Sequence, residues 1–330
     1  MLAYAAAGDE TYPEVEALGH IIERSSYDQE HIQAVLQLPL VDVPAIRQAG
    51  LRVVVDAVNS VGGVVIPALL RALGVDVIEL NCTPNGHFAH NPEPLPEHLT
   101  EISARVAAEK ANLGVVVDPD VDRLALVCED GSMFGEEYTL VAVADYVLSH
   151  TPGSTVSNLS SSRALRDVTE RHGCQYYAAA VGEVNVVAKM KEVNAVIGGE
   201  GNGGVIYPAL HYGRDALVGV ALFLTHLVHS GLSASQLRAT YPAYYISKNK
   251  IQLTPDIDVD AVLARMKERY AHEQVNDIDG VKIDFPTQWV HLRKSNTEPI
   301  IRIYSESRDR ASADALAEKI MDEIRSMVNH

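Results

Sequence analysis

The sequence VVVDPDVDR, residues 115–123, is the most informative part of the chain. Three valines in succession are typical of a buried strand, and the Asp-Pro step that follows favours a tight loop. Asp118, Asp120 and Asp122 alternate within that loop. A cluster of carboxylate oxygens of this kind suits a hard cation such as Mg2+. Arg123 comes next and could hold a second anion, most simply a phosphate.

The aspartate loop allows three other interpretations. It can be an acidic turn that closes a strand and binds nothing. An EF-hand loop begins with the same alternation, and Glu129 would supply its last ligand, but its central position needs Gly and holds Arg123. In an aspartyl-nucleophile phosphatase a strand ends in Asp-x-Asp, and Asp118 would be the nucleophile. The third aspartate and the arginine fit a metal-binding loop better, which favours metal-assisted phosphoryl transfer.

The composition predicts a globular protein of several domains. A chain of 330 residues is longer than one ordinary domain. The net charge of −17 argues against nucleic acid or an anionic membrane as a partner. The sequence has no apolar run long enough to span a membrane and no signal peptide at its start. Because Cys82, Cys128 and Cys174 are few and far apart, we expect reduced thiols and a cytoplasmic protein.

Hydrophobic patterns divide the chain into four parts, with boundaries near residues 46, 132 and 244. Residues 1–45 are mixed and partly acidic. In 46–132 and 133–243 strands alternate with helices, which predicts two consecutive α/β domains with mixed, mainly parallel sheets flanked by helices. Residues 244–330 predict a smaller α+β domain with an antiparallel sheet and helices on one side.

The same patterns predict individual elements. Strands are expected at 51–56, 75–80, 114–118, 124–129, 155–157, 175–179, 195–199, 245–253, 281–285, 288–292 and 300–305. Helices are expected at 27–36, 61–73, 97–110, 137–148, 162–172, 183–191, 215–228, 259–270 and 311–327. Between them, His87, His90 and His98 fall in a Pro-rich stretch, where we expect a solvated loop.

A basic turn, RKSNTEP at residues 293–299, is the second candidate site. Its short polar side chains and backbone amides could form a nest for an anion. Arg293 before the turn and Arg302 after it could clamp a phosphate from two sides. The alternative is an ordinary surface hairpin, for which Ser-Asn-Thr is a common composition.

A glycine-rich segment, GGEGNGG at residues 198–204, is the third candidate. Five glycines in seven residues allow a backbone to approach a ligand closely. Glu200 and Asn202 are the only side chains there that could bind sugar hydroxyls. The segment is not a P-loop, because no Lys-Ser/Thr pair follows. A flexible turn remains the alternative.

Taken together, the three loops resemble those of the α-D-phosphohexomutase superfamily, which includes phosphoglucomutase, phosphomannomutase and phosphoglucosamine mutase. Residues 118–123 match its D-x-D-x-D-R metal loop. Residues 293–306 match its phosphate loop, R-x-S-N-T-E-P-x-x-R-x-x-x-E, at every specified position. The sugar loop, usually G-E-x-S-G-H, corresponds to residues 199–204 and departs at Asn202 and Gly204. The resemblance covers about residues 46–330.

The largest departure from the family is the lack of its phosphoserine motif, T/S-A-S-H-N-P, anywhere in these 330 residues. The family has four domains, and the first carries that serine. The resemblance therefore implies that residues 1–45 are a remnant of domain I, that 46–132, 133–243 and 244–330 are domains II, III and IV, and that the chain alone is catalytically incomplete. The surface that domain I would cover could then support self-association.

The resemblance implies an isomerase that interconverts hexose or hexosamine 1- and 6-phosphates through a phosphoserine and a bisphosphate. The resemblance also implies a Mg2+ cofactor bound by Asp118, Asp120 and Asp122, with Arg123 supporting catalysis. The sugar of the phosphosugar substrate would be bound by Glu200, Asn202 and Arg214. Its phosphate would be bound by Arg293, Ser295, Asn296, Thr297 and Arg302. The alternative is a non-catalytic phosphosugar-binding or scaffolding protein.

Overall fold

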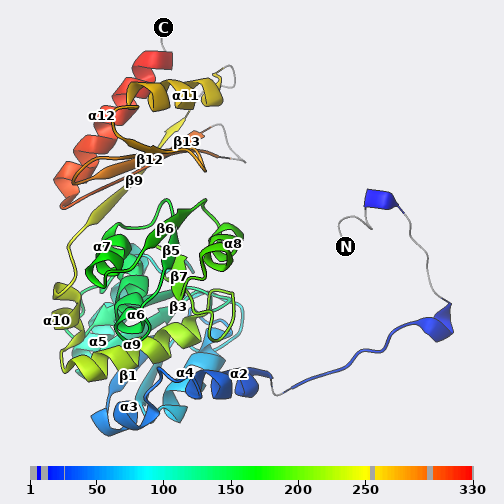
Figure 1. Cartoon of the computed structure of the whole chain (residues 1–330). Helices are drawn as coiled ribbons and strands as arrows, with labels where there is room; N and C mark the ends of the chain where they lie inside the picture. Colours follow the sequence, from blue (N-terminus) through cyan, green and yellow to red (C-terminus); the bar gives the residue numbers. More distant parts are fainter. Residues whose placement is uncertain (1–5, 9–13, 26, 253–256, 296–299, 329–330) are drawn as a thin grey trace.

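The computed structural model describes residues 6–8, 14–25, 27–252, 257–295 and 300–328 (Figure 1). Asn296 and Thr297, two of the residues expected to bind phosphate, lie outside this part of the chain. A short 3-10 turn, η1 (Val15–Ala17), lies in the segment that extends away from the rest of the molecule. In the described residues, no helix has the length and apolar character that crossing a membrane requires.

The first α/β unit contains a four-stranded sheet in the order β2-β1-β3-β4. Its strands are β1 (Arg52–Asp56), β2 (Asp76–Leu80), β3 (Leu113–Val117) and β4 (Leu124–Cys128). The first three run parallel, and β4 is antiparallel to β3. Helix α4 (Gly62–Ala72) covers one face, and α5 (Thr100–Glu109), which follows the turn η2 (Pro96–His98), covers the other.

The second α/β unit repeats this plan. Its sheet has the order β6-β5-β7-β8, with β8 antiparallel to β7. The strands are β5 (Thr155–Asn158), β6 (Tyr176–Ala179), β7 (Ile197–Glu200) and β8 (Gly204–Ile206). The helices are α6 (Glu136–His150), α7 (Ala164–Arg171), α8 (Glu183–Val193), α9 (Ala216–Ser230) and α10 (Ala234–Ala239). Both units therefore have the mixed, mainly parallel sheets with flanking helices that the sequence predicts.

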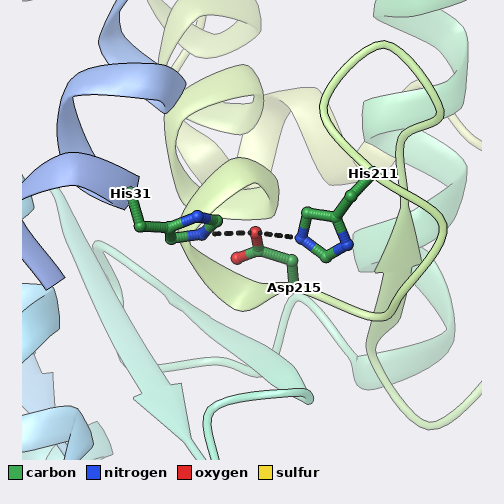
Figure 2. Close-up of side chains that lie close together, drawn as sticks. All are labelled: His31, His211 and Asp215. Carbon is green, nitrogen blue, oxygen red and sulfur yellow. Dashed lines mark hydrogen bonds and ion pairs between the residues drawn. The ribbon is translucent and has the colours of Figure 1, made fainter. Parts of the chain in front are cut away.

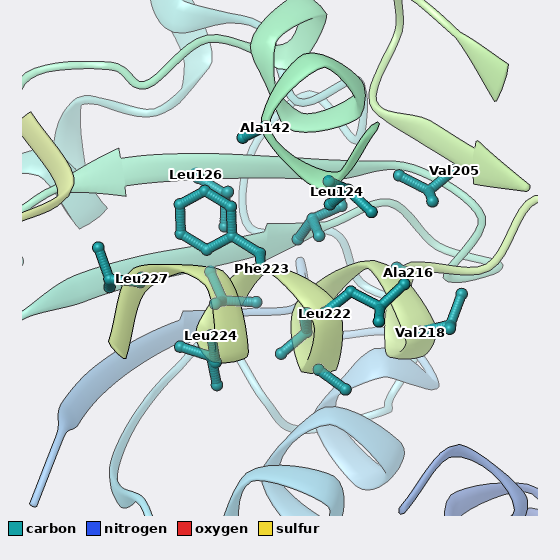
Figure 3. Close-up of a cluster of buried hydrophobic side chains, with 14 of the residues drawn as sticks. Leu124, Leu126, Ala142, Val205, Ala216, Val218, Leu222, Phe223, Leu224 and Leu227 are labelled. Carbon is teal, nitrogen blue, oxygen red and sulfur yellow. The ribbon is translucent and has the colours of Figure 1, made fainter. Parts of the chain in front are cut away.

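The two α/β units share one hydrophobic core, and α9 lies in the middle of it (Figure 3). Every residue from Ala216 to Thr225 is buried, so this helix is apolar all round and has no solvent face there. It packs against β4 and α4 of the first unit and against α6 and β8 of the second. Helices α2 (Tyr27–Leu36) and α3 (Val43–Ala49) cover its remaining side.

The C-terminal unit has a core of its own and lies at the top of Figure 1. Its five strands are all antiparallel, in the order β10-β11-β12-β13-β9. They are β9 (Tyr245–Gln252), β10 (Gln274–Asn276), β11 (Val281–Asp284), β12 (Trp289–Lys294) and β13 (Ile300–Ser307). Helices α11 (Val259–Arg269) and α12 (Arg310–Val328) cover one face. This arrangement confirms the predicted antiparallel α+β domain.

Apart from the 3-10 turns, four short elements in the described residues are not indicated by the sequence patterns: α3, β8, α10 and β10. They have three to seven residues each, which is too few for a clear hydrophobic period. Capping signals were nevertheless present for α3. Asp42 accepts a hydrogen bond from the Ala45 amide at its start, and Gly50 ends it with φ of 60°.

The shared core leads to a first prediction. Phe223 on α9 is fully buried and meets Phe134 edge to face, with ring centroids 5.0 Å apart. We expect Phe223→Ala to lower the free energy of unfolding by about 3–5 kcal/mol, because it leaves a cavity between the two sheets. Amide hydrogen exchange should accelerate in β1 and β7 together, since Val53, Val55 and Ile197 on these strands belong to the same core as Phe223.

The control is Val184→Ala, because Val184 is 81% exposed on α8. It should change the free energy of unfolding by no more than about 0.5 kcal/mol. Faster exchange in only one of the two sheets after Phe223→Ala would contradict the single shared core.

Candidate active site

The aspartate loop begins where β3 ends, at the carboxyl edge of the first sheet. Ligand oxygens of Asp118, Asp120 and Asp122 all lie within 4.8 Å of one another. The loop closes on itself because Asp118 Oδ1 accepts hydrogen bonds from the backbone amides of Asp122 (3.1 Å) and Arg123 (3.0 Å). Sequence and backbone thus bring three carboxylates into a space that one small cation could fill.

The electrostatics of this loop fit a cation. Burial, with a further contribution from the charge of Asp122, raises the pKa of Asp118 well above its usual range. Oδ1 of Asp122 is buried without a hydrogen-bond partner in the described residues. A buried carboxylate oxygen of this kind is costly unless an ion or water satisfies it. The donor set is all oxygen, which suits Mg2+ or a similar hard ion.

The loop also stores backbone strain. Val121, between the second and third aspartates, has φ of 62°, a conformation that β-branched residues rarely adopt. Its carbonyl accepts a hydrogen bond from the Ala216 amide at the start of α9 (3.0 Å). This hydrogen bond fixes the strained loop to the second α/β unit. A strained backbone conformation persists only when the surrounding structure stabilises it in this way.

Two arginines flank the aspartates. The Arg123 guanidinium lies 3.5 Å from Asp118 Oδ2 and 3.6 Å from Asp122 Oδ1. Arg214, which precedes α9, donates to Asp122 Oδ2 and, at 2.7 Å, to Glu200 Oε2. The expectation placed Arg214 with the sugar-binding residues. In the structure its guanidinium bridges the aspartate loop and the glycine-rich loop.

The glycine-rich loop packs directly on the aspartate loop. The Leu124 amide donates to the Gly203 carbonyl over 3.1 Å. Gly203 has φ of 90°, and a Cβ there would lie 2.3 Å from the Leu124 carbonyl oxygen, so only glycine fits this approach. Asn202, beside it, lines a small cavity with Arg123, Glu136 and Lys248.

Glu200 is buried and already makes three hydrogen bonds. It accepts from Asn158 Nδ2 (2.7 Å), from the Gly182 amide (3.2 Å) and from Arg214. A carboxylate has about four acceptor positions, so about one remains for a sugar hydroxyl. The sequence could not show that most of this capacity holds the loop together.

The phosphate turn follows β12 in the C-terminal unit. Directly opposite positions on three neighbouring strands hold Arg293, Arg302 and Lys250. Like charges placed directly opposite in a sheet are destabilising, and a bound anion relieves them. Arg293 is partly balanced by Asp279 Oδ2 at 3.1 Å, while Arg302 and Lys250 are exposed. The alignment of β9 with β13 adds Lys250, which no motif in the sequence indicates.

Buried polar contacts fix the C-terminal unit to the second α/β unit. Arg163, almost fully buried, donates to the carbonyls of Pro286 and Gln288, both at 3.2 Å. The Lys282 ammonium donates to the Leu159 carbonyl at 2.8 Å. Glu306, in the phosphate-loop motif, is also buried here and accepts from Trp289 Nε1 (2.6 Å) and the Arg163 amide (3.1 Å). These contacts help to position β12 and β13, the strands on either side of the phosphate turn.

The expectation of a solvated loop holds for residues 83–89, which include His87 and are exposed, but not for His90. Nε2 of His90 lies 3.1 Å from Oδ2 of the buried Asp56. Asp56 ends β1, so this contact ties the loop to the same sheet edge as the aspartate cluster. The two residues are 34 positions apart, and no local pattern links them.

Three models of the phosphoglucomutase/phosphomannomutase family match the chain. They describe alpha/beta/alpha domain II at residues 29–131, alpha/beta/alpha domain III at 135–244 and the C-terminal domain at 250–323. A protein of Methanopyrus kandleri named probable phosphoglucosamine mutase is 32% identical over 97% of this chain and 71% of its own length. A phosphoglucomutase/phosphomannomutase of Thermococcus kodakarensis is 38% identical over 83% of this chain and 60% of its own length.

A solved structure agrees with these matches. The crystal structure of a phosphoglucomutase/phosphomannomutase family protein from Burkholderia thailandensis is similar with a TM-score of 0.78 at 27% identity, over 92% of this chain and 65% of that one. The chain thus spans about two thirds of the length of the proteins it matches. Family models for domains II, III and IV match in order, and a relative is 32% identical over 97% of this chain, so the chain belongs to the phosphoglucomutase/phosphomannomutase family.

Proposed function

We propose that these residues form the metal, sugar and phosphate sites of a phosphohexose mutase, an isomerase that interconverts the 1- and 6-phosphates of a hexose or hexosamine. The main support for this proposal is that Arg214 hydrogen-bonds to both Asp122 and Glu200, and so joins the aspartate loop to the glycine-rich loop. A metal site and a sugar site that share one arginine suit a reaction in which a phosphoryl group moves to or from a sugar hydroxyl. Membership of the family supports the same conclusion.

In this proposal Mg2+ is held by Asp118, Asp120 and Asp122. When bound, it neutralises charge that develops on the transferred phosphoryl group. The Arg123 guanidinium, which lies beside the same carboxylates, stabilises the negative charge on the phosphoryl group as well. Arg214 keeps Asp122 in place while it also orients Glu200.

The remaining loops hold the substrate. Glu200 accepts a hydrogen bond from a sugar hydroxyl, and Asn202 accepts from or donates to another, with Arg214 beside them. The phosphate that does not react is bound by the row of cations on the C-terminal sheet, together with the polar turn; the residues concerned are Arg293, Ser295, Asn296, Thr297 and Arg302, with Lys250 added. The candidate substrates are glucosamine, glucose and mannose phosphates. Names of the relatives favour a hexosamine or hexose phosphate.

The mutase reaction needs a group that gives a phosphoryl group to the substrate and takes one back from the bisphosphate. In the family that group is a phosphoserine, and the 330 residues contain no T/S-A-S-H-N-P motif that would supply it. The second candidate function follows from this observation. A chain with these sites and no phosphoryl donor would bind phosphosugars without turning them over.

Replacement of Asp120 by Asn tests the metal site. Asp120 is the exposed member of the cluster, so its loss should leave the fold intact. We expect isothermal calorimetry to show Mg2+ binding to the wild type and none to Asp120→Asn, and Mg2+ to raise the Tm of the wild type alone. Because the pKa of Asp118 is raised, protons compete with the ion, and Mg2+ affinity should increase as the pH rises towards neutrality.

Asp130→Asn is the matched control, because Asp130 is an exposed aspartate in the turn after β4. It should bind Mg2+ as the wild type does. Equal heats for the wild type and Asp120→Asn would remove the metal assignment.

Replacement of Arg302 by Gln tests the phosphate site through two effects of opposite sign. Affinity for glucose 6-phosphate should fall by at least about tenfold, because a charge-assisted hydrogen bond is worth about 1.5–3 kcal/mol. Without ligand, the variant should be as stable as the wild type or more stable, since a like charge opposite Arg293 and Lys250 is gone. Calorimetry and urea denaturation measure the two effects.

Arg269→Gln is the control for this test. Arg269 lies at the end of α11 in the same unit and pairs with Glu323 at 3.1 Å, outside the cation row. Its removal should leave sugar-phosphate affinity unchanged. A loss of affinity equal to that of Arg302→Gln would indicate an effect of net charge alone.

A mutase assay decides between the two candidate functions. The 330 residues alone should bind glucosamine, glucose or mannose phosphates and should not interconvert their 1- and 6-phosphates. A longer protein that includes a segment with the serine motif should do so, and Asp120→Asn should abolish that activity. Turnover by the 330 residues alone at enzymatic rates would refute the need for a separate donor. Binding without turnover in the longer protein would favour the non-catalytic alternative.

A further inference from the structure

A second cluster of metal-binding side chains lies where α2 meets the start of α9 (Figure 2). His31 projects from α2, His211 comes from the loop between β8 and α9, and Asp215 is the N-cap of α9. One ligand atom of each lies within 4.8 Å of the other two. None of the three has a part in the proposed mutase reaction.

The Asp215 carboxylate is fixed in place and presents one oxygen to both histidines. Its Oδ1 accepts hydrogen bonds from the amides of Leu217 (2.8 Å) and Val218 (3.2 Å). Its Oδ2 lies 2.8 Å from His31 Nε2 and 3.0 Å from His211 Nε2. A helix cap needs only the first oxygen. The convergence of two imidazoles on the second oxygen is therefore not explained by capping.

The separations are close to those of neighbouring ligands around one ion. With metal–ligand bonds of about 2.1 Å, neighbouring ligand atoms lie about 3.0 Å apart in an octahedral site and about 3.4 Å apart in a tetrahedral one. The two Nε2–Oδ2 distances, 2.8 and 3.0 Å, are near the lower value, so a tetrahedral ion requires the side chains to separate by a few tenths of an ångström. The imidazole rings are tilted by 53°, with centroids 5.8 Å apart, so their Nε2 atoms approach the carboxylate from different directions.

The chemistry of the three side chains also suits a metal ion. A carboxylate with two imidazoles is a ligand set that favours Zn2+ and related transition-metal ions over Mg2+.

We propose that His31, His211 and Asp215 form a binding site for a divalent transition-metal ion of the Zn2+ class, with water completing its coordination. The His31 side chain is 29% exposed and that of His211 43%, so water reaches the open positions. On binding, each Nε2 that carries a proton releases it to solvent and donates its lone pair to the ion. The bound ion joins residues 184 positions apart, and so fastens α2 to α9.

The test is a Zn2+ titration by calorimetry in excess Mg2+, with the wild type and the variants His31→Gln and His211→Gln. Loss of an outer-shell partner alone weakens metal sites by about 10- to 100-fold, so loss of a direct ligand should weaken Zn2+ binding by at least that factor. Zn2+ should also raise the Tm of the wild type, and this rise should be absent in both variants.

Two controls separate this site from others. His229→Gln removes a histidine at the opposite end of α9 whose Nε2 lies 2.9 Å from Asp42 Oδ2, a His–Asp pair with one histidine only. Asp120→Asn disables the aspartate loop. Both should keep the wild-type Zn2+ affinity.

A measurement on the unmodified protein covers the case in which a variant fails to fold. Zn2+ should shift the imidazole 15N resonances of His31 and His211 and leave those of His229 in place. Unchanged resonances at His31 and His211 would overturn the proposal. Equal Zn2+ affinity in the wild type, His31→Gln and His211→Gln would overturn it as well, and would mean that the three side chains form a hydrogen-bonded cluster only.

Discussion

The burial of α9 is the constraint on which the arrangement of the sites depends. A helix that is apolar all round over its first ten residues can exist only inside a core, so the two α/β units must close around it. Its N-terminal end then has a fixed position and direction. Arg214 and Asp215 precede the helix as neighbours in the chain, and their side chains enter two different clusters. The packing of one helix therefore sets the geometry of both.

The C-terminal unit is attached in a different way. Its hydrophobic core is separate, and its contacts with the second α/β unit include those of Arg163, Lys282 and Glu306, which are buried. Buried ionic contacts of this kind add little net stability, but breaking one partner is costly because the other is left unsatisfied. Such contacts specify one orientation of the sheet. The cation row on that sheet is thereby held in one orientation relative to the second α/β unit.

Much of the fold could be predicted from the sequence because each main element has a long, clear pattern. The alternation of strands and helices after residue 51 and the antiparallel C-terminal sheet were both evident from periodicity. The shared core was not, because the sequence of α9 shows only that the helix is apolar and not what surrounds it. Short elements such as β8 carry too few residues for a pattern.

In the candidate site, too, some features could be predicted from the sequence and others could not. Motifs identified the three loops because each is contiguous in sequence. Partners that arrive from distant positions were missed: Lys250 joins Arg302 only through the register of β9 with β13, and His31 meets Asp215 only because α2 packs on α9. Glu200 shows a further limit of prediction from sequence. Its residue type was informative, but its three internal hydrogen bonds depend on the tertiary structure.

The row formed by Arg293, Arg302 and Lys250 has a consequence for substrate choice. Three cations on neighbouring strands attract a phosphate by its charge, and this attraction does not depend on which carbon of the sugar carries the phosphate. In the proposed mutase reaction the intermediate binds in two opposite orientations, so a phosphate site that does not contact the sugar suits both. Under the same proposal, discrimination among hexoses would come from the glycine-rich loop. Changes of sugar preference between relatives are expected to map to positions such as Asn202, while the cation row stays constant.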